Sequence, residues 1–250
     1  MSANIQSAKS RLVDYKAHYQ ADAEEIVDPA SLDPVRRASE YRRLQTLVRV
    51  LDLRRGERLL DIGCGSGWLG DYCQRQGAIV CAMDIGFSGV AGAKLRFPQA
   101  ADYQVGDLYY LPFAAASFDA VVLSEVVEHL EDIDAAFAEA RRVLRAGGRL
   151  LVSVPYRETI VEHLCIHCNQ RTPADAHLHR FDEAILAAHF QRQGLQIRQV
   201  RLMTNKLLEL GGFPRLSVRW PYAVWRAIDV LVNKVVSKPA FLCMLGSSGD

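Results

Sequence analysis

A glycine-rich turn is the part of the sequence best suited to binding a ligand through its backbone. Residues 59–67 read Leu-Leu-Asp-Ile-Gly-Cys-Gly-Ser-Gly, an apolar strand that runs into the turn. Glycines let the chain turn sharply and approach a ligand without a Cβ in the way. A dinucleotide fingerprint needs glycine at position 68, where Trp68 stands. The spacing therefore favours a cofactor without a pyrophosphate and argues against a dinucleotide-dependent oxidoreductase.

Acidic residues follow the next two apolar segments. Asp84 ends the run 79–84, and Asp107 comes directly after the run 103–106. A carboxylate accepts two hydrogen bonds at once, which suits ligand binding. Taken singly, each Asp is better explained as the N-cap of the following helix. Together, Asp84 and Asp107 follow the glycine-rich turn in sequence, each at the end of an apolar segment, and this order favours a binding site.

A histidine follows the fourth apolar segment. Residues 124–130 read Ser-Glu-Val-Val-Glu-His-Leu. An imidazole titrates near neutral pH, so His129 is a candidate general base for a reaction at an oxygen atom of an acceptor molecule. A structural role for His129 at a helix end is an equal alternative.

Cysteine and histidine cluster in a later segment. The candidate ligands of a zinc ion are Cys165, Cys168, His177 and His179. Two thiolates and two imidazoles complete a tetrahedral zinc shell, and four protein ligands leave no open position, which favours a structural metal. The spacing does not match the common zinc-finger pattern. Zinc and a metal-free set of reduced thiols with pocket-lining histidines stay open with equal weight.

Alternating strands and helices must position these groups. Apolar strands are predicted at 58–62, 79–84, 103–106, 118–124, 148–154, 196–203 and 240–245. The segments between the first five are long enough for helical crossovers, which is typical of parallel βαβ units. Ligands of such sheets collect at the carboxyl ends of the strands. We therefore expect a doubly wound α/β fold.

Two helical regions flank this core. Residues 10–50 have a helical pattern broken at Pro29 and Pro34. Four arginines surround its apolar face, and we interpret them as solvated: Arg36, Arg37, Arg42 and Arg43. Within residues 213–238, the run from Pro221 through Val235 predicts an amphipathic helix that contains Trp225, follows Trp220 and covers the sheet. The alternative is that this helix forms a lid or platform for a hydrophobic or phosphate-bearing acceptor molecule and contacts a membrane surface peripherally.

The ordered motifs resemble those of class I S-adenosylmethionine-dependent methyltransferases of the small-molecule type. Residues 61–67 are similar to the family's first motif, and 124–130 are similar to the matching stretch of quinone-biosynthesis O-methyltransferases. Residues 144–150 resemble the family's turn into the fifth strand. The resemblance implies a mostly parallel, seven-stranded, Rossmann-like sheet with an N-terminal helical extension. It covers about residues 40–155 firmly.

The resemblance also implies roles for single residues. Asp84 accepts from both ribose hydroxyls, Asp107 accepts from the adenine amino group, and Leu108 packs beside the ring. Ser124 and Glu125 line the methionine end. The full set of expected cofactor-binding residues is Asp61, Gly63, Gly65, Gly67, Asp84, Ile85, Asp107, Leu108, Ser124 and Glu125.

Composition limits the alternatives. A formal net charge of +1 gives no global attraction to nucleic acid. The Asp/Asn-Pro-Pro-Tyr segment that resembling families use to methylate nitrogen of bases is absent, because 124–127 occupies its place. No stretch reaches the roughly 20 apolar residues that cross a bilayer, and residues 1–8 lack a signal-peptide pattern. We expect a soluble, cytoplasmic protein of unknown oligomeric state.

We interpret the chain as a single domain with three parts. Residues 1–55 are the helical cap, 56–155 the cofactor-binding core, and 156–250 the acceptor side with a metal loop at 163–179. The predicted reaction moves a methyl group from S-adenosylmethionine to an oxygen, and less favourably a carbon, of a small molecule or cell-envelope precursor. The alternatives are a cofactor-binding protein without turnover and a nucleic-acid methyltransferase.

Overall fold

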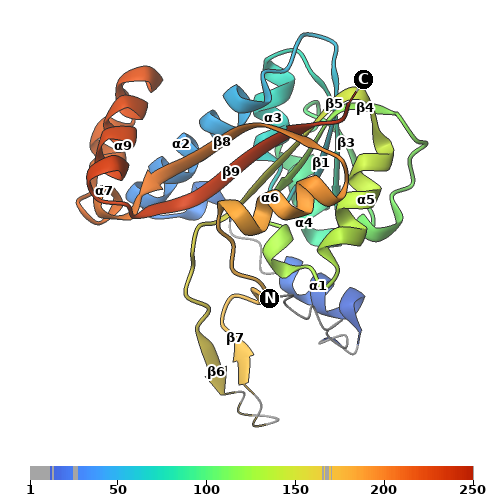
Figure 1. The fold of residues 1–250 in the computed structure, drawn as a ribbon, viewed down its shortest axis with the longest axis horizontal. Coiled ribbons are helices and arrows are strands. Elements are labelled where there is room, and N and C mark those ends of the chain that lie inside the picture. The colour runs from blue at the N-terminus through green and yellow to red at the C-terminus, as the bar shows by residue number, and fades with distance from the viewer. Residues whose placement is uncertain are drawn as a thin grey trace, which may run out of the picture.

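The computed structural model describes residues 12, 14–24, 28–164, 166, 169 and 171–249. One sheet in it has the strand order β3-β2-β1-β4-β5-β9-β8 (Figure 1). Its strands are β1 (Arg58–Ile62), β2 (Ile79–Asp84), β3 (Asp102–Val105), β4 (Phe118–Ser124), β5 (Leu144–Pro155), β8 (Gln196–Asn205) and β9 (Pro239–Ser247). The first five strands are parallel, whereas β9 runs antiparallel to both β5 and β8. The predicted seven-stranded, mostly parallel sheet is confirmed.

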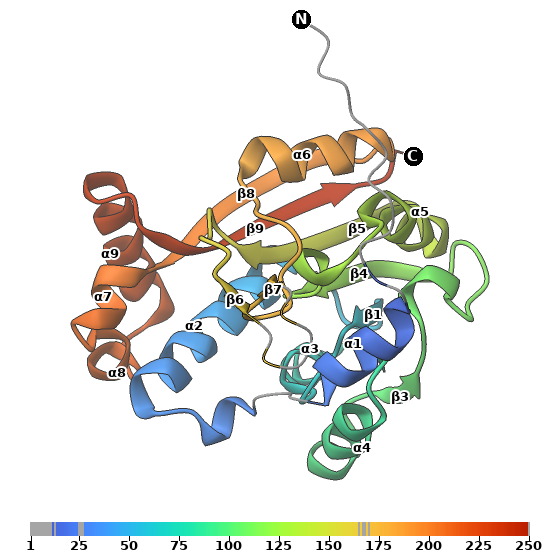
Figure 2. The same cartoon turned by 90° about the horizontal axis from the view of Figure 1, so that it is seen from below.

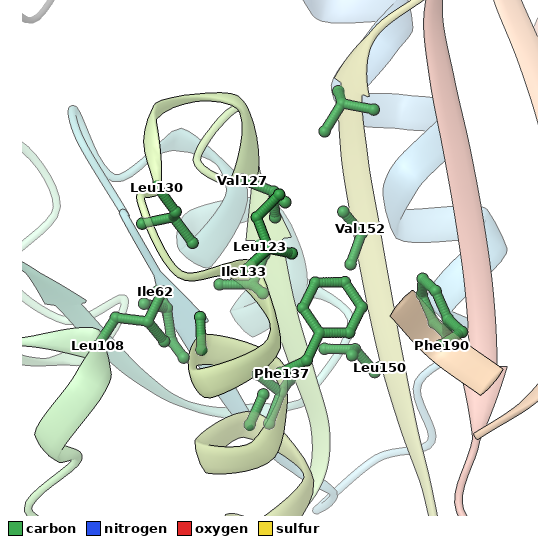
Figure 3. Packing of buried hydrophobic residues seen from close by; sticks show 14 of the residues in the cluster. Ile62, Leu108, Leu123, Val127, Leu130, Ile133, Phe137, Leu150, Val152 and Phe190 are labelled. Carbon is green, nitrogen blue, oxygen red and sulfur yellow. The ribbon is translucent and has the colours of Figure 1, made fainter. Parts of the chain in front are cut away.

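Helices cover both faces of the sheet because alternate strand residues point to opposite sides. The helices that flank the sheet include α2 (Pro34–Leu51), α3 (Trp68–Arg75), α4 (Phe87–Arg96), α5 (Ile133–Val143) and α6 (Glu183–Arg192). Leu123 of β4 belongs to one core with Phe137 of α5 and Phe190 of α6 (Figure 3). The next residue back, Val122, belongs to a second core with Leu47 of α2. Full burial of each such side chain contributes about 1.5–3 kcal/mol.

Short helices precede the sheet, as the proline breaks predict. They are α1 (Tyr15–Ala23) and the 3₁₀ turn η1 (Pro29–Ser31). Helix α2 begins at Pro34 because Asp33 caps it, accepting from the backbone N–H groups of Val35 and Arg36. Helix α1 is held by the loop between η3 (Val127–His129) and α5, because the backbone N–H of Glu131 donates to the Tyr19 hydroxyl over 2.7 Å. Helix α1 thereby lies near the carboxyl ends of the strands (Figure 2).

The interpretation of all four α2 arginines as solvated is wrong for two of them. Arg36 and Arg37 are exposed, whereas Arg42 and Arg43 are buried at 1% and 8% exposure. The Arg42 guanidinium donates to the backbone carbonyls of Ser217, Val218 and Trp220. These carbonyls lie more than 170 residues away in sequence, so the helix pattern alone gave no sign of them.

The C-terminal third contains the amphipathic helix that was expected from Pro221 through Val235. Residues 213–238 form α8 (Phe213–Ser217) and α9 (Tyr222–Val235), and α7 (Lys206–Leu210) precedes them. The chain breaks at Pro221, which begins the second helix as its N-cap. Trp225 is buried at 2%, as the covering role requires, whereas Trp220 is 42% exposed. A hairpin of β6 (Glu162–Leu164) and β7 (Arg171–Pro173) projects away from the sheet (Figure 1).

In the part of the chain that the structure describes, each helix is too short or too polar to cross a bilayer.

Candidate active site

One cavity of about 380 Å³ lies at the carboxyl ends of β1, β2 and β4. Nine of the ten expected cofactor-binding residues line it: Asp61, Gly63, Gly65, Asp84, Ile85, Asp107, Leu108, Ser124 and Glu125. The tenth, Gly67, does not line the cavity and is the N-cap of α3. A cavity of this size at the strand ends of an open α/β sheet is suited to a small cofactor.

The glycine-rich turn is set by close packing as well as by ligand access. Gly63 has a φ of +72°, and a Cβ there would lie 2.2 Å from Cγ2 of Val126. The backbone N–H groups of Gly63 and Cys64 both donate to the Met83 carbonyl at the end of β2. Only glycine combines that dihedral with that approach. The turn is therefore held against β2 and the loop after β4 before any ligand arrives.

Asp84 connects the glycine-rich turn to the next helix. One carboxylate oxygen accepts from the Gly65 N–H over 2.9 Å, and the other accepts from the Gly86 N–H over 3.0 Å. The side chain is buried, and burial raises its pKa although these two hydrogen bonds oppose that rise. Asp84 thus lies where the resemblance requires an acceptor, with further lone pairs facing the cavity.

Asp107 connects the cavity to the N-terminal helix. It accepts from the Tyr15 hydroxyl over 2.9 Å and lies 3.1 Å from Nζ of Lys16. Its other oxygen caps the 3₁₀ turn η2 (Leu108–Tyr110) by accepting from the Tyr109 N–H. Leu108 is buried at 7%. Helix α1 therefore covers this end of the cavity, with Tyr19 in its lining.

The opposite end of the cavity contains a buried arginine that the sequence analysis did not assign to the site. The Arg43 guanidinium donates to Ser124 Oγ over 2.7 Å and to Glu40 over 2.9 Å, and it lies 3.5 Å from Glu125. Glu125 has a φ of +56°, a strained conformation of the kind that concentrates at functional sites. One signal was available: Arg43 precedes the core residue Leu47 by four positions and so shares its face of α2.

Several carboxylates at this edge are buried without enough positive charge to balance them. Asp61 is 1% exposed, and burial together with the negative charge of Asp84 raises its pKa to about 7. Burial also raises the pKa of Glu125 and raises that of Glu128 well above its usual range. Arg43 opposes the rise at all three groups. The cavity is therefore an acidic site that favours a cationic ligand.

His129 lines the same cavity, next to the loop that follows β4. It ends the 3₁₀ turn η3 (Val127–His129), and its Nδ1 lies 3.2 Å from the Asp22 carboxylate of α1. Burial, followed by the neighbouring His177 and His18, lowers its pKa to about 4. The imidazole is therefore neutral near pH 7 and has a nitrogen that can accept a proton or bind a metal.

The predicted zinc ligands are only partly described by the structure. Cys165 and Cys168 lie outside the described residues. His177 Nδ1 lies 2.5 Å from Glu158, whereas His179 Nε2 bonds to the Leu130 carbonyl over 2.6 Å. The two imidazoles thus have separate partners. His177 instead lies against His129, with ring centroids 4.8 Å apart.

The family comparison decides what this arrangement is. Residues 60–152 match the family model described as a methyltransferase domain. Over this range the chain is similar to methyltransferases, and so are its curated relatives. The matched range begins in β1, ends in β5 and contains both the glycine-rich turn and the two cavity-lining aspartates.

Curated relatives agree over this domain. The chain is 37% identical over 112 residues to a demethylmenaquinone methyltransferase of Thermobifida fusca, covering 43% of this chain and 48% of the relative. It is 34% identical over 130 residues to a ubiquinone biosynthesis O-methyltransferase of a Bradyrhizobium strain, covering 51% of each. The chain thus spans about half the length of these relatives.

Solved structures extend the likeness in fold to most of the chain. A geranyl diphosphate methyltransferase in complex with its diphosphate and sinefungin superposes with a TM-score of 0.69 at 15% identity, over 94% of this chain and 99% of that one. A [4+2]-cyclase superposes with a TM-score of 0.61 at 21% identity, over 83% of this chain and 81% of that one. At these identities the likeness concerns the fold alone.

Proposed function

We propose that the methyltransferase domain binds S-adenosylmethionine in the cavity and transfers its methyl group to an oxygen of a small-molecule acceptor. Carbon is the less favoured acceptor atom. The observation that carries the proposal is convergence: the turn at Gly65, Asp84 and Asp107 line one cavity although they follow three different strands. The O-methyltransferase relatives support oxygen as the acceptor atom.

In this proposal each group of cavity residues binds a different part of the cofactor. Asp107 and Leu108 hold the adenine, and Asp84 accepts from the ribose hydroxyls. Ser124 and Glu125 line the methionine end, together with Asp61 and the turn at Gly65. The sulfonium is already electrophilic, so the protein mainly aligns the acceptor with the methyl group and excludes water. His129 is the proposed base for an acceptor hydroxyl, and a weak one, because burial lowers its pKa to about 4.

Binding and transfer are tested separately. Calorimetric titration with S-adenosylmethionine should give one site per chain, and Asp84→Ala should weaken it at least tenfold. Asp102→Ala is the matched control. Asp102 is exposed and begins the neighbouring strand β3, at the edge of the sheet opposite the strands' carboxyl ends. Undiminished binding by Asp84→Ala would overturn the site. Transfer of a labelled methyl group should then occur to phenols or carboxylic acids in preference to amines.

The second candidate is a protein of this fold that binds the cofactor without transferring its methyl group. The cyclase among the structural neighbours supports this candidate, since it is named for a reaction other than methyl transfer. Tight cofactor binding without label transfer to any compound of the acceptor panel would support this candidate. Nucleic-acid methylation has no comparable support, and salt-insensitive, weak RNA binding would remove it.

Zinc at Cys165, Cys168, His177 and His179 stays a prediction. So does peripheral membrane contact through residues 213–238. The side chains of Leu216 and Val235 are 72% and 76% exposed there, and Arg219 and Lys234 are exposed in the same segment. Apolar and basic side chains together suit an anionic membrane surface.

A further inference from the structure

We infer that Glu128, His129 and His177 bind a divalent transition-metal ion at the edge of the cavity that His129 lines. One ligand atom from each of the three residues lies within 4.8 Å of the others. They come from η3 and from the loop after β7, two segments separated by nearly fifty residues. Two imidazoles and one carboxylate form a common ligand set for zinc and related divalent ions.

The backbone holds the two segments together. The Glu128 carbonyl accepts from the Leu178 N–H over 2.7 Å and from the His179 N–H over 3.2 Å. The His179 ring also bonds to the Leu130 carbonyl. The loop that carries His177 is therefore anchored on both sides of His129. The three ligands are brought together by hydrogen bonds that do not use their ligating atoms.

Glu128 is the observation that points to a missing partner. Its side chain is 1% exposed, and among the described residues neither carboxylate oxygen has a hydrogen-bond partner. A buried carboxylate without hydrogen bonds is strongly disfavoured unless an ion or a proton compensates it. Arg43 is the nearby cation, but its guanidinium already bonds to Glu40 and Ser124. A metal ion in contact with both histidines supplies the compensation.

The histidines have the second interactions that metal ligands usually have. His177 Nδ1 lies 2.5 Å from Glu158, and His129 Nδ1 lies 3.2 Å from Asp22. A ligating imidazole typically directs one nitrogen to a carboxylate and the other to the metal. In both residues Nδ1 is the ring nitrogen that lies next to a carboxylate. The carboxylates of Glu158 and Asp22 also add negative charge around the cation.

The acceptor class follows from the position of the site, and this step depends on the proposed methyl transfer. His129 lines the cavity beside Glu125, and three protein ligands leave coordination positions open. An ion there binds an acceptor that presents a hydroxyl next to a second oxygen, such as a catechol or a hydroxy acid. It lowers the pKa of that hydroxyl as a Lewis acid. His129 is then a ligand, so the ion replaces it as the means of removing the proton.

The test is metal binding by the full chain after treatment with a chelator. Titration with Zn²⁺, and with Co²⁺ as a spectroscopic probe, should give one site per chain. His177→Ala should weaken Zn²⁺ binding by roughly 100-fold, and Glu158→Gln by about 10- to 100-fold, since it only orients a ligand. His189→Ala is the matched control, because His189 is a similarly buried imidazole bonded to a carboxylate, that of Asp134.

Each outcome decides the inference. Absence of binding, or equal binding by His177→Ala and the control, would overturn it. Loss of the Zn²⁺ site in a Cys165→Ser, Cys168→Ser variant with retention in His177→Ala would place the ion at the cysteines and also overturn it. S-adenosylmethionine titration of the chelator-treated protein separates the two proposals, since intact cofactor binding without a metal site leaves the proposed function standing. Full methyl transfer by metal-free protein would remove the Lewis-acid role.

Discussion

Replacing Asp61 with asparagine should remove a large part of the pH dependence of stability of the cofactor-free protein. The folded state raises the pKa of this carboxyl from 3.8 to about 7. Below about pH 4 the group is protonated in both states and has no effect on the free energy of unfolding. As pH rises toward 7, the unfolded chain loses the proton first. Stability is therefore lost across this window.

The size of the loss follows from the shift. One proton of difference between the two states changes the free energy of unfolding by about 1.4 kcal/mol per pH unit. Over the window from 3.8 to about 7, the Asp61 carboxyl therefore destabilises the fold by about 4 kcal/mol. Asparagine has nearly the same shape and no charge, so it keeps the low-pH stability at high pH. Asp61→Asn should exceed the wild type by several kcal/mol near pH 8 and equal it near pH 4.

Urea denaturation followed by circular dichroism measures both proteins across this range. The buried carboxyls of Asp84, Glu125 and Glu128 also have raised pKa values, but they are present in both proteins. The difference between the two curves therefore reports Asp61 together with its electrostatic coupling to Asp84. The exposed Asp102, replaced in the same way, is the control. Parallel curves for wild type and Asp61→Asn would refute the reasoning.

Four further outcomes are expected. Asp84→Asn should fold normally and weaken S-adenosylmethionine binding about 10- to 100-fold by calorimetry, since a charge-assisted hydrogen bond contributes about 1.5–3 kcal/mol. Gly63→Ala should lower the free energy of unfolding in urea by about 1–3 kcal/mol because of its positive φ and the 2.2 Å approach, whereas Gly92→Ala, with open space around it, should not. Trp225→Ala should lose about 3–5 kcal/mol in the same assay, because the ring is 2% exposed. Leu216→Glu should reduce cosedimentation with anionic vesicles, and unchanged cosedimentation would argue against membrane contact.

Local pattern predicted the central sheet well. The bounds of β1, β2 and β4 agree with the predicted 58–62, 79–84 and 118–124. These strands are apolar at consecutive positions, as expected when helices cover both faces. The convergence of the cavity residues was predictable for the same reason, since parallel strands bring their carboxyl ends to one edge.

Contacts distant in sequence were not predictable. Nothing around Arg42 indicates the carbonyls of residues 217–220 that accept from it. The approach of His177 to His129 depends on a loop that returns to η3 after the β6–β7 hairpin. Neither stretch of sequence has a pattern that indicates contact with the other. The same holds for the antiparallel β9, because the sequence shows a strand without its direction. Periodicity reports which face is buried but not what covers it.

The excess of buried acid groups in the cavity bears on turnover. S-adenosylmethionine carries a positive sulfonium, whereas the thioether left after methyl transfer is neutral. In the proposed function, Asp61 and Glu125 line the cofactor site, attract the first species and gain nothing electrostatic from the second. The pocket thereby distinguishes spent from fresh cofactor by charge, which limits product inhibition. Entry of the cation also releases protons from these acids, so affinity for S-adenosylmethionine should increase in alkaline buffer while affinity for the spent thioether changes less.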